Sequence, residues 1–121
     1  MARQLIAVGT RFRVEALMHP NGAYEVCDFL EAQSAQDQAK LRALFERLAE
    51  VGRISNVEKF KKVSGDIWAF KSFQIRVFCF FASDRRVVLV YGLKKKTDRY
   101  SPKEIDRAER LRQFWFSSRK R

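Results

Sequence analysis

The basic residues that follow the most apolar stretch of the chain are the first candidates for chemistry. Residues 73–81 are almost all β-branched or aromatic with one interior charge, Arg76, and a second apolar run spans residues 87–91. Gly92 ends the second run, and three cations follow closely: Lys94, Lys95 and Lys96. Because a strand end fixes the backbone, cations placed there can be aimed at a ligand, and phosphate groups are natural partners for them. The spacing therefore predicts a phosphate-binding site.

The positive charge of the chain is concentrated toward its C-terminus. The net charge is +11 at pH 7, and residues 85–121 hold 13 basic and 4 acidic side chains, a surplus of 9. Residues 1–52, in contrast, hold 6 basic and 7 acidic side chains. Such asymmetry indicates a polyanion or an acidic protein that docks on one side of the molecule. The basic residues 119–121 fit a solubilising tail, whereas the cluster at residues 94–99 lies between two ordered elements.

Several classes of site are disfavoured by the residue types present. His19 is the only histidine, and Cys27 and Cys79 lie in apolar patterns without a CxxC pair. A zinc site or a histidine-based triad is therefore not expected, and neither is a cofactor. Buried free thiols suit a reducing cytoplasm, and no apolar run approaches the ~20 residues that a membrane span needs. The N-terminal residues also lack the form of a secretory signal, so we expect a cytoplasmic protein.

Apolar periodicity predicts one strand and two helices in the first half of the chain. Residues 11–18 alternate with a period of two, as a strand does, and residues 19–22 form a turn signal. Helical spacing covers residues 23–33, and Ser34 caps a second helix that runs to Val51. The second helix presents one apolar stripe: Leu41, Leu44, Phe45, Leu48 and Val51. Two such helices would pack over one face of a sheet.

The second half of the chain contributes the remaining strands and a last helix. Residues 54–65 are expected to be irregular, and three short strands follow from residue 67 onward. The segment Ser101-Pro102-Lys103-Glu104 has the form of a capping box and opens a helix. Tyr100 lies just before this cap, where it either forms a hydrophobic staple with Ile105 or has a functional role. Residues 1–121 are expected to form a single domain.

Arg76 is unusual because it places a charge inside an apolar strand. With a period of two, Arg76 shares a face with Phe78 and Phe80, so it lies on the sheet and not in a loop. One interpretation is a structural cation that stacks on rings or pairs with a carboxylate. The other is a fixed cation that lines a cleft, where preorganised charge would stabilise an anionic transition state.

The order of these features resembles the RelE/HigB-type toxins, in particular their phage-derived HigB-like branch. The matching stretches lie within residues 23–112 and read Ile67-Trp68-Ala69-Phe70-Lys71, Ile75-Arg76-Val77-Phe78, Gly92-Leu93-Lys94-Lys95-Lys96 and Pro102-Lys103-Glu104-Ile105. Each stretch is a weak signal alone, and their order and spacing give the resemblance its specificity. The sequence departs from the family pattern at Ala69, where many relatives carry glutamate, and at Tyr91, where a histidine is frequent.

The resemblance implies a fold and a function. The implied fold is α+β: two N-terminal helices packed on a small, mostly antiparallel four-stranded sheet, with a short C-terminal helix. The implied function is that of a toxin of a type II toxin–antitoxin system, a ribosome-dependent endoribonuclease that cleaves mRNA in the ribosomal A site without a metal. The implied partners are the 70S ribosome, mRNA and a cognate antitoxin of the helix-turn-helix type.

The resemblance also assigns catalytic roles, to Arg76, Lys94 and Tyr100. Five further cations are expected to contact RNA: Lys59, Lys71, Lys95, Lys96 and Arg99. RNA can be cut by its own 2′-hydroxyl group, which attacks the neighbouring phosphate. Fixed cations would stabilise the additional negative charge, a tyrosine or lysine would assist proton transfer, and the ribosome would position the RNA.

Two other functions fit the same residues. A non-catalytic nucleic-acid-binding module would stack single-stranded bases on the rings between the basic residues: Phe70, Phe73, Phe78 and Phe80. A phage-derived interaction protein would instead dock its basic face on an acidic partner. Cleavage of mRNA on translating ribosomes separates the toxin from both alternatives, and salt-sensitive RNA binding in isolation argues against the interaction protein.

Overall fold

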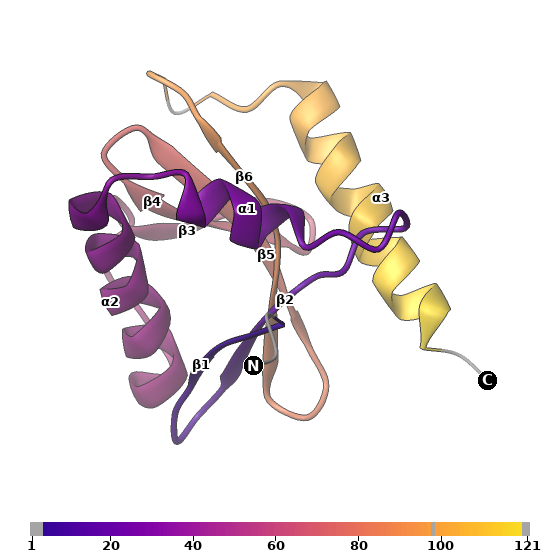
Figure 1. Ribbon diagram of the computed structural model, residues 1–121, viewed down its shortest axis with the longest axis horizontal. Helices are drawn as coiled ribbons and strands as arrows, with labels where there is room; N and C mark the ends of the chain where they lie inside the picture. The colour runs from indigo at the N-terminus through magenta and orange to yellow at the C-terminus, as the bar shows by residue number, and fades with distance from the viewer. Residues whose placement is uncertain (1–3, 98, 120–121) are drawn as a thin grey trace.

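The computed structural model describes residues 4–97 and 99–119, which form an α+β fold around one sheet (Figure 1). Along the chain the elements are β1 (Leu5–Val8), β2 (Arg13–Ala16), α1 (Glu25–Glu31), α2 (Ala35–Val51), β3 (Phe60–Ser64), β4 (Ile67–Ser72), β5 (Ile75–Ala82), β6 (Arg86–Lys94) and α3 (Pro102–Ser118). Within the described ranges, no helix combines the length and the apolar character needed to cross a membrane.

The sheet has six strands in the order β1-β2-β6-β5-β4-β3. β2 and β6 run parallel to each other, and all other neighbouring strands are antiparallel. The prediction of a four-stranded, mostly antiparallel sheet is therefore wrong, because the sheet is six-stranded and mixed. The N-terminal segment adds β1 at one edge, and residues 60–64, which we expected to be irregular, add β3 at the other.

β3 is not predicted from the sequence because it is an edge strand with cations at its centre. Phe60 is buried, whereas Lys62 and Ser64 are exposed, so the apolar alternation by which a strand is recognised is weak. Lysine side chains on an edge strand discourage pairing with a further strand. The strand nevertheless pairs with β4, where Phe60 lies opposite Phe70.

α1 and α2 cover one face of the sheet (Figure 1). Val26 of α1 and Phe45 of α2 belong to an apolar core that includes Val77 of β5. α1 approaches β6 closely at Gly92, where an added Cβ atom would lie 2.4 Å from the ring of Phe29. Gly92 therefore ends the apolar run for a packing reason, since only glycine leaves room for α1 at this point.

α3 covers the opposite face of the sheet, where Trp115 and Phe80 belong to a second apolar core. The predicted capping box is confirmed: Ser101 Oγ accepts a hydrogen bond from the Glu104 amide at 3.2 Å, and Glu104 Oε1 accepts one from the Ser101 amide at 2.9 Å. α3 has 17 residues, as many as α2, so the expectation of a short C-terminal helix is wrong. Its N-terminus lies beside the cations at the end of β6.

Candidate functional site

The candidate site lies at the end of the sheet where β4 and β6 end and β5 begins. In the sheet register Arg76 of β5 lies opposite Lys71 of β4 and opposite Leu93 of β6. Directly opposite residues point to the same face of a sheet, and this face is the one that α3 covers. Arg76 and Lys71 are each only 4% exposed, so two cations lie side by side beneath the surface.

The guanidinium group of Arg76 is fixed by backbone carbonyl groups. Nη1 donates to Phe73 O at 2.7 Å and to Ile75 O at 3.1 Å, and Nη2 lies 3.5 Å from Thr97 O. These bonds link the β4–β5 turn to the segment that follows β6. The carbonyl dipoles offset part of the free-energy cost of burying the charge. The contacts with three carbonyl groups also hold the guanidinium group in one position.

The lysines at the end of β6 point to different sides of the sheet. Lys94 lies opposite Ile75, so its side chain is on the face that α1 and α2 cover, away from Arg76. The next residue, Lys95, is on the Arg76 side, where its Nζ lies 2.6 Å from Glu104 Oε1 and 5.0 Å from the centre of the Tyr100 ring. The predicted catalytic residues Arg76 and Lys94 therefore do not converge on one side of the sheet.

Lys95 has a clear structural role because it pairs with the carboxylate of the capping box. Burial tends to raise the pKa of Glu104, but the hydrogen bonds from Lys95 and from the Ser101 amide outweigh it and lower the pKa below its usual value. Lys95 thus stabilises the start of α3 beside the site. Tyr100, the residue before the cap, packs its ring against Phe78, with the ring centres 5.4 Å apart.

The remaining predicted cations differ in their exposure. Lys96 and Arg99 are exposed on the segment between β6 and α3. Lys59 is also exposed, and its carbonyl accepts a hydrogen bond from the Lys71 amide at 2.8 Å. Its side chain lines a hollow beside α2. The structure thus brings Arg76, Lys71, Lys95 and Tyr100 to one side of the sheet and places Lys94 and Lys59 on the other.

A polar network that sequence analysis missed lies farther along the α3 side. The Tyr91 hydroxyl donates to Glu104 O at 2.8 Å, and the Arg107 guanidinium lies 4.3 Å above the centre of the Tyr91 ring. Arg107 Nη2 also lies 2.7 Å from Glu25 Oε2, and His19 Nδ1 lies 3.6 Å from the same oxygen. No local sequence pattern predicts this network, because its members come from four separate segments of the chain.

The electrostatics of this network favour a structural role. Burial raises the pKa of Tyr91 to about 12, so its hydroxyl stays protonated at neutral pH and acts as a hydrogen-bond donor. The hydrogen bond from Arg107 lowers the pKa of Glu25. Tyr91 occupies the position where relatives often have a histidine, and a protonated phenol of this kind cannot serve as a general base near pH 7.

The side chains at the site are suited to binding anions. Within residues 4–97 and 99–119, no group of three or more His, Cys, Asp or Glu side chains is placed to hold a metal ion. Cys27 and Cys79 are free and buried, and burial raises the pKa of the Cys79 thiol, which keeps it protonated and unreactive. The side chains at this end of the sheet are mainly those of lysine, arginine and tyrosine, with the Glu104 carboxylate paired to Lys95.

Comparison with known proteins places the chain in a family. The family model described as phage derived protein Gp49-like (DUF891) matches residues 28–113, which include α2, all strands from β3 to β6 and most of α3. The matched region thus contains all the predicted site residues. A search of curated proteins gives no match. Because the family model covers most of the sequence, the chain belongs to the phage-derived Gp49-like family.

Proposed function

We propose that the chain is the toxin of a toxin–antitoxin pair and that it cleaves mRNA on the ribosome. Three features support the proposal: membership of a phage-derived family, the resemblance to RelE/HigB-type toxins, and the cations gathered at one end of the sheet. The observation that carries it is the rigid, buried guanidinium of Arg76. A toxin of this kind acts in the cytoplasm, where it meets ribosomes.

In the proposed mechanism, the cations divide the work according to their exposure. Lys94, Lys96 and Arg99 are exposed and contact the phosphates of the RNA. Arg76 and Lys71 are buried on the α3 side of the sheet and supply a fixed positive potential, which costs no reorganisation when negative charge develops on the phosphate. Tyr100, at the edge of this cluster, is the candidate for proton transfer.

The reaction balances without a metal. The ribose 2′-oxygen attacks the adjacent phosphorus, the bond from phosphorus to the 5′-oxygen breaks, and a cyclic phosphate and a 5′-hydroxyl group form. The 2′-hydroxyl proton leaves to a base, and the 5′-oxygen receives a proton from an acid. The ribosome supplies the alignment of the attacking and leaving oxygens. The proposed partners are therefore the ribosome, mRNA and an antitoxin that neutralises the basic surface.

The test combines growth and cleavage. Expression of the chain alone in bacteria should stop growth, and the purified chain should cut mRNA on a programmed ribosome. The triple variant Lys94→Ala/Lys96→Ala/Arg99→Ala should lose cleavage, because it removes the exposed phosphate contacts. The matched control is Arg42→Ala/Arg47→Ala/Arg110→Ala, which removes the same charge from exposed positions on α2 and α3. Unimpaired growth with confirmed soluble expression would contradict the proposal, as would equal losses in the two triple variants.

A second function, RNA binding without cleavage, is favoured by one observation. Arg76 and Lys71 are 4% exposed, and Lys94 is on the other face of the sheet from Arg76. In this alternative Arg76 organises the β4–β5 turn and the segment after β6. The two functions differ in a single-turnover assay, where the binding module would retain intact mRNA on the ribosome.

A further inference from the structure

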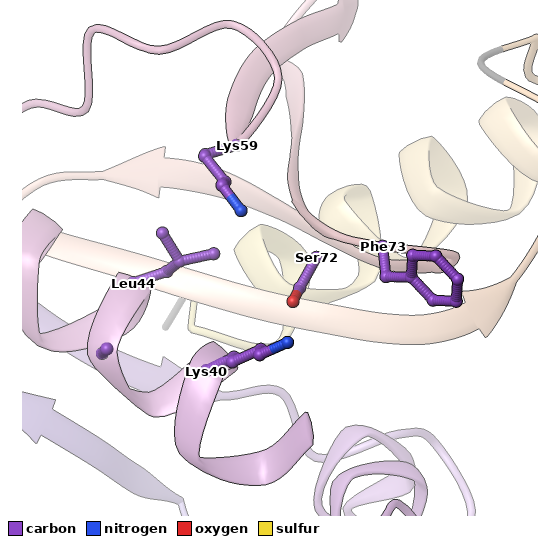
Figure 2. Close-up of a pocket in the computed structure, with 6 residues that line it drawn as sticks. Lys40, Leu44, Lys59, Ser72 and Phe73 are labelled. Atoms are coloured by element: carbon purple, nitrogen blue, oxygen red, sulfur yellow. The ribbon is translucent and has the colours of Figure 1, made fainter. Parts of the chain in front are cut away.

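A hollow of about 450 Å³ lies between α2 and the β4–β5 turn (Figure 2). Six residues line it: Lys40, Ala43 and Leu44 of α2, Lys59 before β3, and Ser72 and Phe73 at the β4–β5 turn. The volume falls within the ~300–1,000 Å³ that is typical of ligand pockets. The hollow therefore has room for a small group, and it lies away from the face on which Arg76 is buried.

Phe73, at the rim of this hollow, is not packed into the fold. Its side chain is 84% exposed, and its φ of 57° is in the left-handed region that disfavours residues with a Cβ atom. A glycine would remove both the strain and the exposed ring. The turn is nevertheless rigid, because the Phe73 carbonyl accepts the 2.7 Å hydrogen bond from Arg76. The chain thus exposes an unpacked aromatic ring on an anchored turn, at a cost to its stability.

The walls of the hollow are positively charged. The ammonium groups of Lys40 and Lys59 enter from opposite sides, with the hydroxyl group of Ser72 between them (Figure 2). None of the described residues that line the hollow is acidic. Two ammonium groups and a hydroxyl group are suited to a phosphate. The exposed ring of Phe73, which points outward at the rim (Figure 2), offers a surface on which a base can stack.

We propose that this hollow is a subsite for one nucleotide of single-stranded RNA. The phosphate lies between Lys40 and Lys59, and the base stacks on Phe73. The inference rests on the proposed function in taking RNA as the ligand. An acidic side chain would satisfy the lysines, but it would leave the ring of Phe73 without a partner.

The position of Lys94 connects this subsite to the candidate site. Lys94 of β6 lies opposite Ile75, which follows Phe73 by two residues, so Lys94 is on the same face of the sheet as the hollow. An RNA strand held in the hollow can therefore continue along the end of the sheet to Lys94.

The first test measures binding of a fluorescent single-stranded oligoribonucleotide to the isolated full chain at several salt concentrations. Lys40→Ala/Lys59→Ala should weaken binding about tenfold or more and reduce the slope of log affinity against log salt by about 0.7, because one phosphate contact is lost. The matched control is Arg47→Ala/Lys62→Ala, which also removes one exposed cation from α2 and one from the β3 region. This control should bind within about twofold of the wild type, because its cations do not line the hollow.

The second test uses Phe73→Gly to separate binding from folding. Removal of the ring should weaken binding about 5- to 150-fold, the range that one stacked base contributes, and should leave the salt dependence unchanged. The same change relieves the positive φ, so the melting temperature should not fall. Phe73→Trp keeps a stacking surface and should retain binding. Wild-type RNA affinity in Phe73→Gly would overturn the subsite. Equal losses of RNA affinity in Lys40→Ala/Lys59→Ala and in the control Arg47→Ala/Lys62→Ala would also overturn it.

The assay also distinguishes this inference from the proposed function, because it needs neither ribosome nor cleavage. A chain that binds RNA through the hollow but leaves mRNA intact would contradict the proposed function and support the subsite. Normal cleavage by Lys40→Ala/Lys59→Ala and by Phe73→Gly would contradict the subsite alone. Binding of a polyglutamate peptide that these variants abolish, without binding of the oligoribonucleotide, would assign the hollow to an acidic protein and overturn the RNA subsite.

Discussion

The two ends of the β5–β6 pair are both basic, but they hold their arginines in different ways. At the candidate end, Arg76 is inside a strand, 4% exposed and bonded to the Phe73 carbonyl. At the far end, Arg85 is in the turn between the two strands, exposed, with Nη1 3.3 Å from Thr10 O. Both ends contain residues with positive φ, so local strain does not distinguish them.

The far end is also hollowed and charged. A depression of about 550 Å³ is lined by Arg11, Phe12, Val51, Gly52, Arg53 and Arg85. Its arginines are exposed to solvent, where counterions screen their charge. Both ends are therefore rich in cations, so the number of cations does not distinguish them. What differs is whether the charge is fixed and shielded from water, since only fixed charge acts preferentially on a transition state.

The largest expected effect separates the two ends directly. Arg76→Ala should lower single-turnover cleavage on a programmed ribosome by ~10²–10³, the usual loss for one preorganised donor. Arg85→Ala should cleave within a few-fold of the wild type, because its charge is already solvated. Ribosome binding should change little in either variant.

Because Arg76 also bonds backbone carbonyl groups, its variant needs a folding control. Arg76→Lys keeps the charge with fewer donors, and it should recover part of the rate if the charge matters for cleavage. Circular dichroism and a thermal melt would verify that each variant is folded. If Arg76→Ala cleaves like the wild type while Arg85→Ala does not, the active end of the sheet is the far end.

Some features of the candidate end could be predicted from the sequence because they are local. The capping box of α3 is recognised from Ser101, Pro102 and Glu104 in order. Arg76 is recognised because it is the one charged residue in an apolar strand. The mixed sheet could not be predicted in this way. The parallel pairing of β2 with β6 joins residues 13–16 to residues 86–89, and no short pattern links segments so far apart.

The direction of the lysine side chains could not be predicted either, for a more specific reason. The β5–β6 register shifts between Phe78 and Cys79, so one residue of β6 is left without a partner there. Such a bulge reverses the facing of every β6 side chain beyond it, relative to a regular strand. The bulge therefore decides whether Lys94 or Lys95 shares a face with Arg76, and nothing in the apolar run of β6 reveals it.

A smaller effect, on stability, should distinguish the packing of α2 near the candidate end of the sheet from its packing farther along the helix. Leu48 is fully buried, whereas Leu44 is only partly buried and lines the hollow next to Phe73. Leu48→Ala should lower the free energy of unfolding by ~2–5 kcal/mol, as is typical of core leucines. Leu44→Ala should cost about 1 kcal/mol, since part of its side chain is already in water.

Urea unfolding of both variants would measure this difference. Equal and large losses would show that α2 is packed as tightly at the candidate end as elsewhere, and the hollow would then have to be closed in solution. A loss near zero for Leu48→Ala would contradict the packing of α2 on the sheet.

The smallest expected effect is on the pH dependence of stability, and it involves two carboxylates, one at each end of the sheet. Hydrogen bonds from the Thr10 hydroxyl and amide lower the pKa of Glu50 at the far end. At the candidate end, bonds from Lys95 and Ser101 lower the pKa of Glu104 against the opposing effect of burial. A lowered folded-state pKa means that each carboxylate stabilises the fold above its unfolded pKa of about 4.5, and that this contribution is lost as the pH falls through the folded value.

The two carboxylates should differ in their response to salt. Lys95 and Glu104 are oppositely charged and partly exposed, so Lys95→Met should cost only ~0.2–1 kcal/mol at pH 7, and the cost should shrink in 1 M salt. Thr10 is uncharged, so the effect of Thr10→Val should depend little on salt. Thermal melts of both variants at pH 7 and pH 3, in low and high salt, would check this. Lys95→Met should lose less stability than the wild type between the two pH values. If Lys95→Met and the wild type lose the same stability between the two pH values, Lys95 does not stabilise the ionised Glu104 carboxylate. The start of α3 would then be stabilised by its capping box alone.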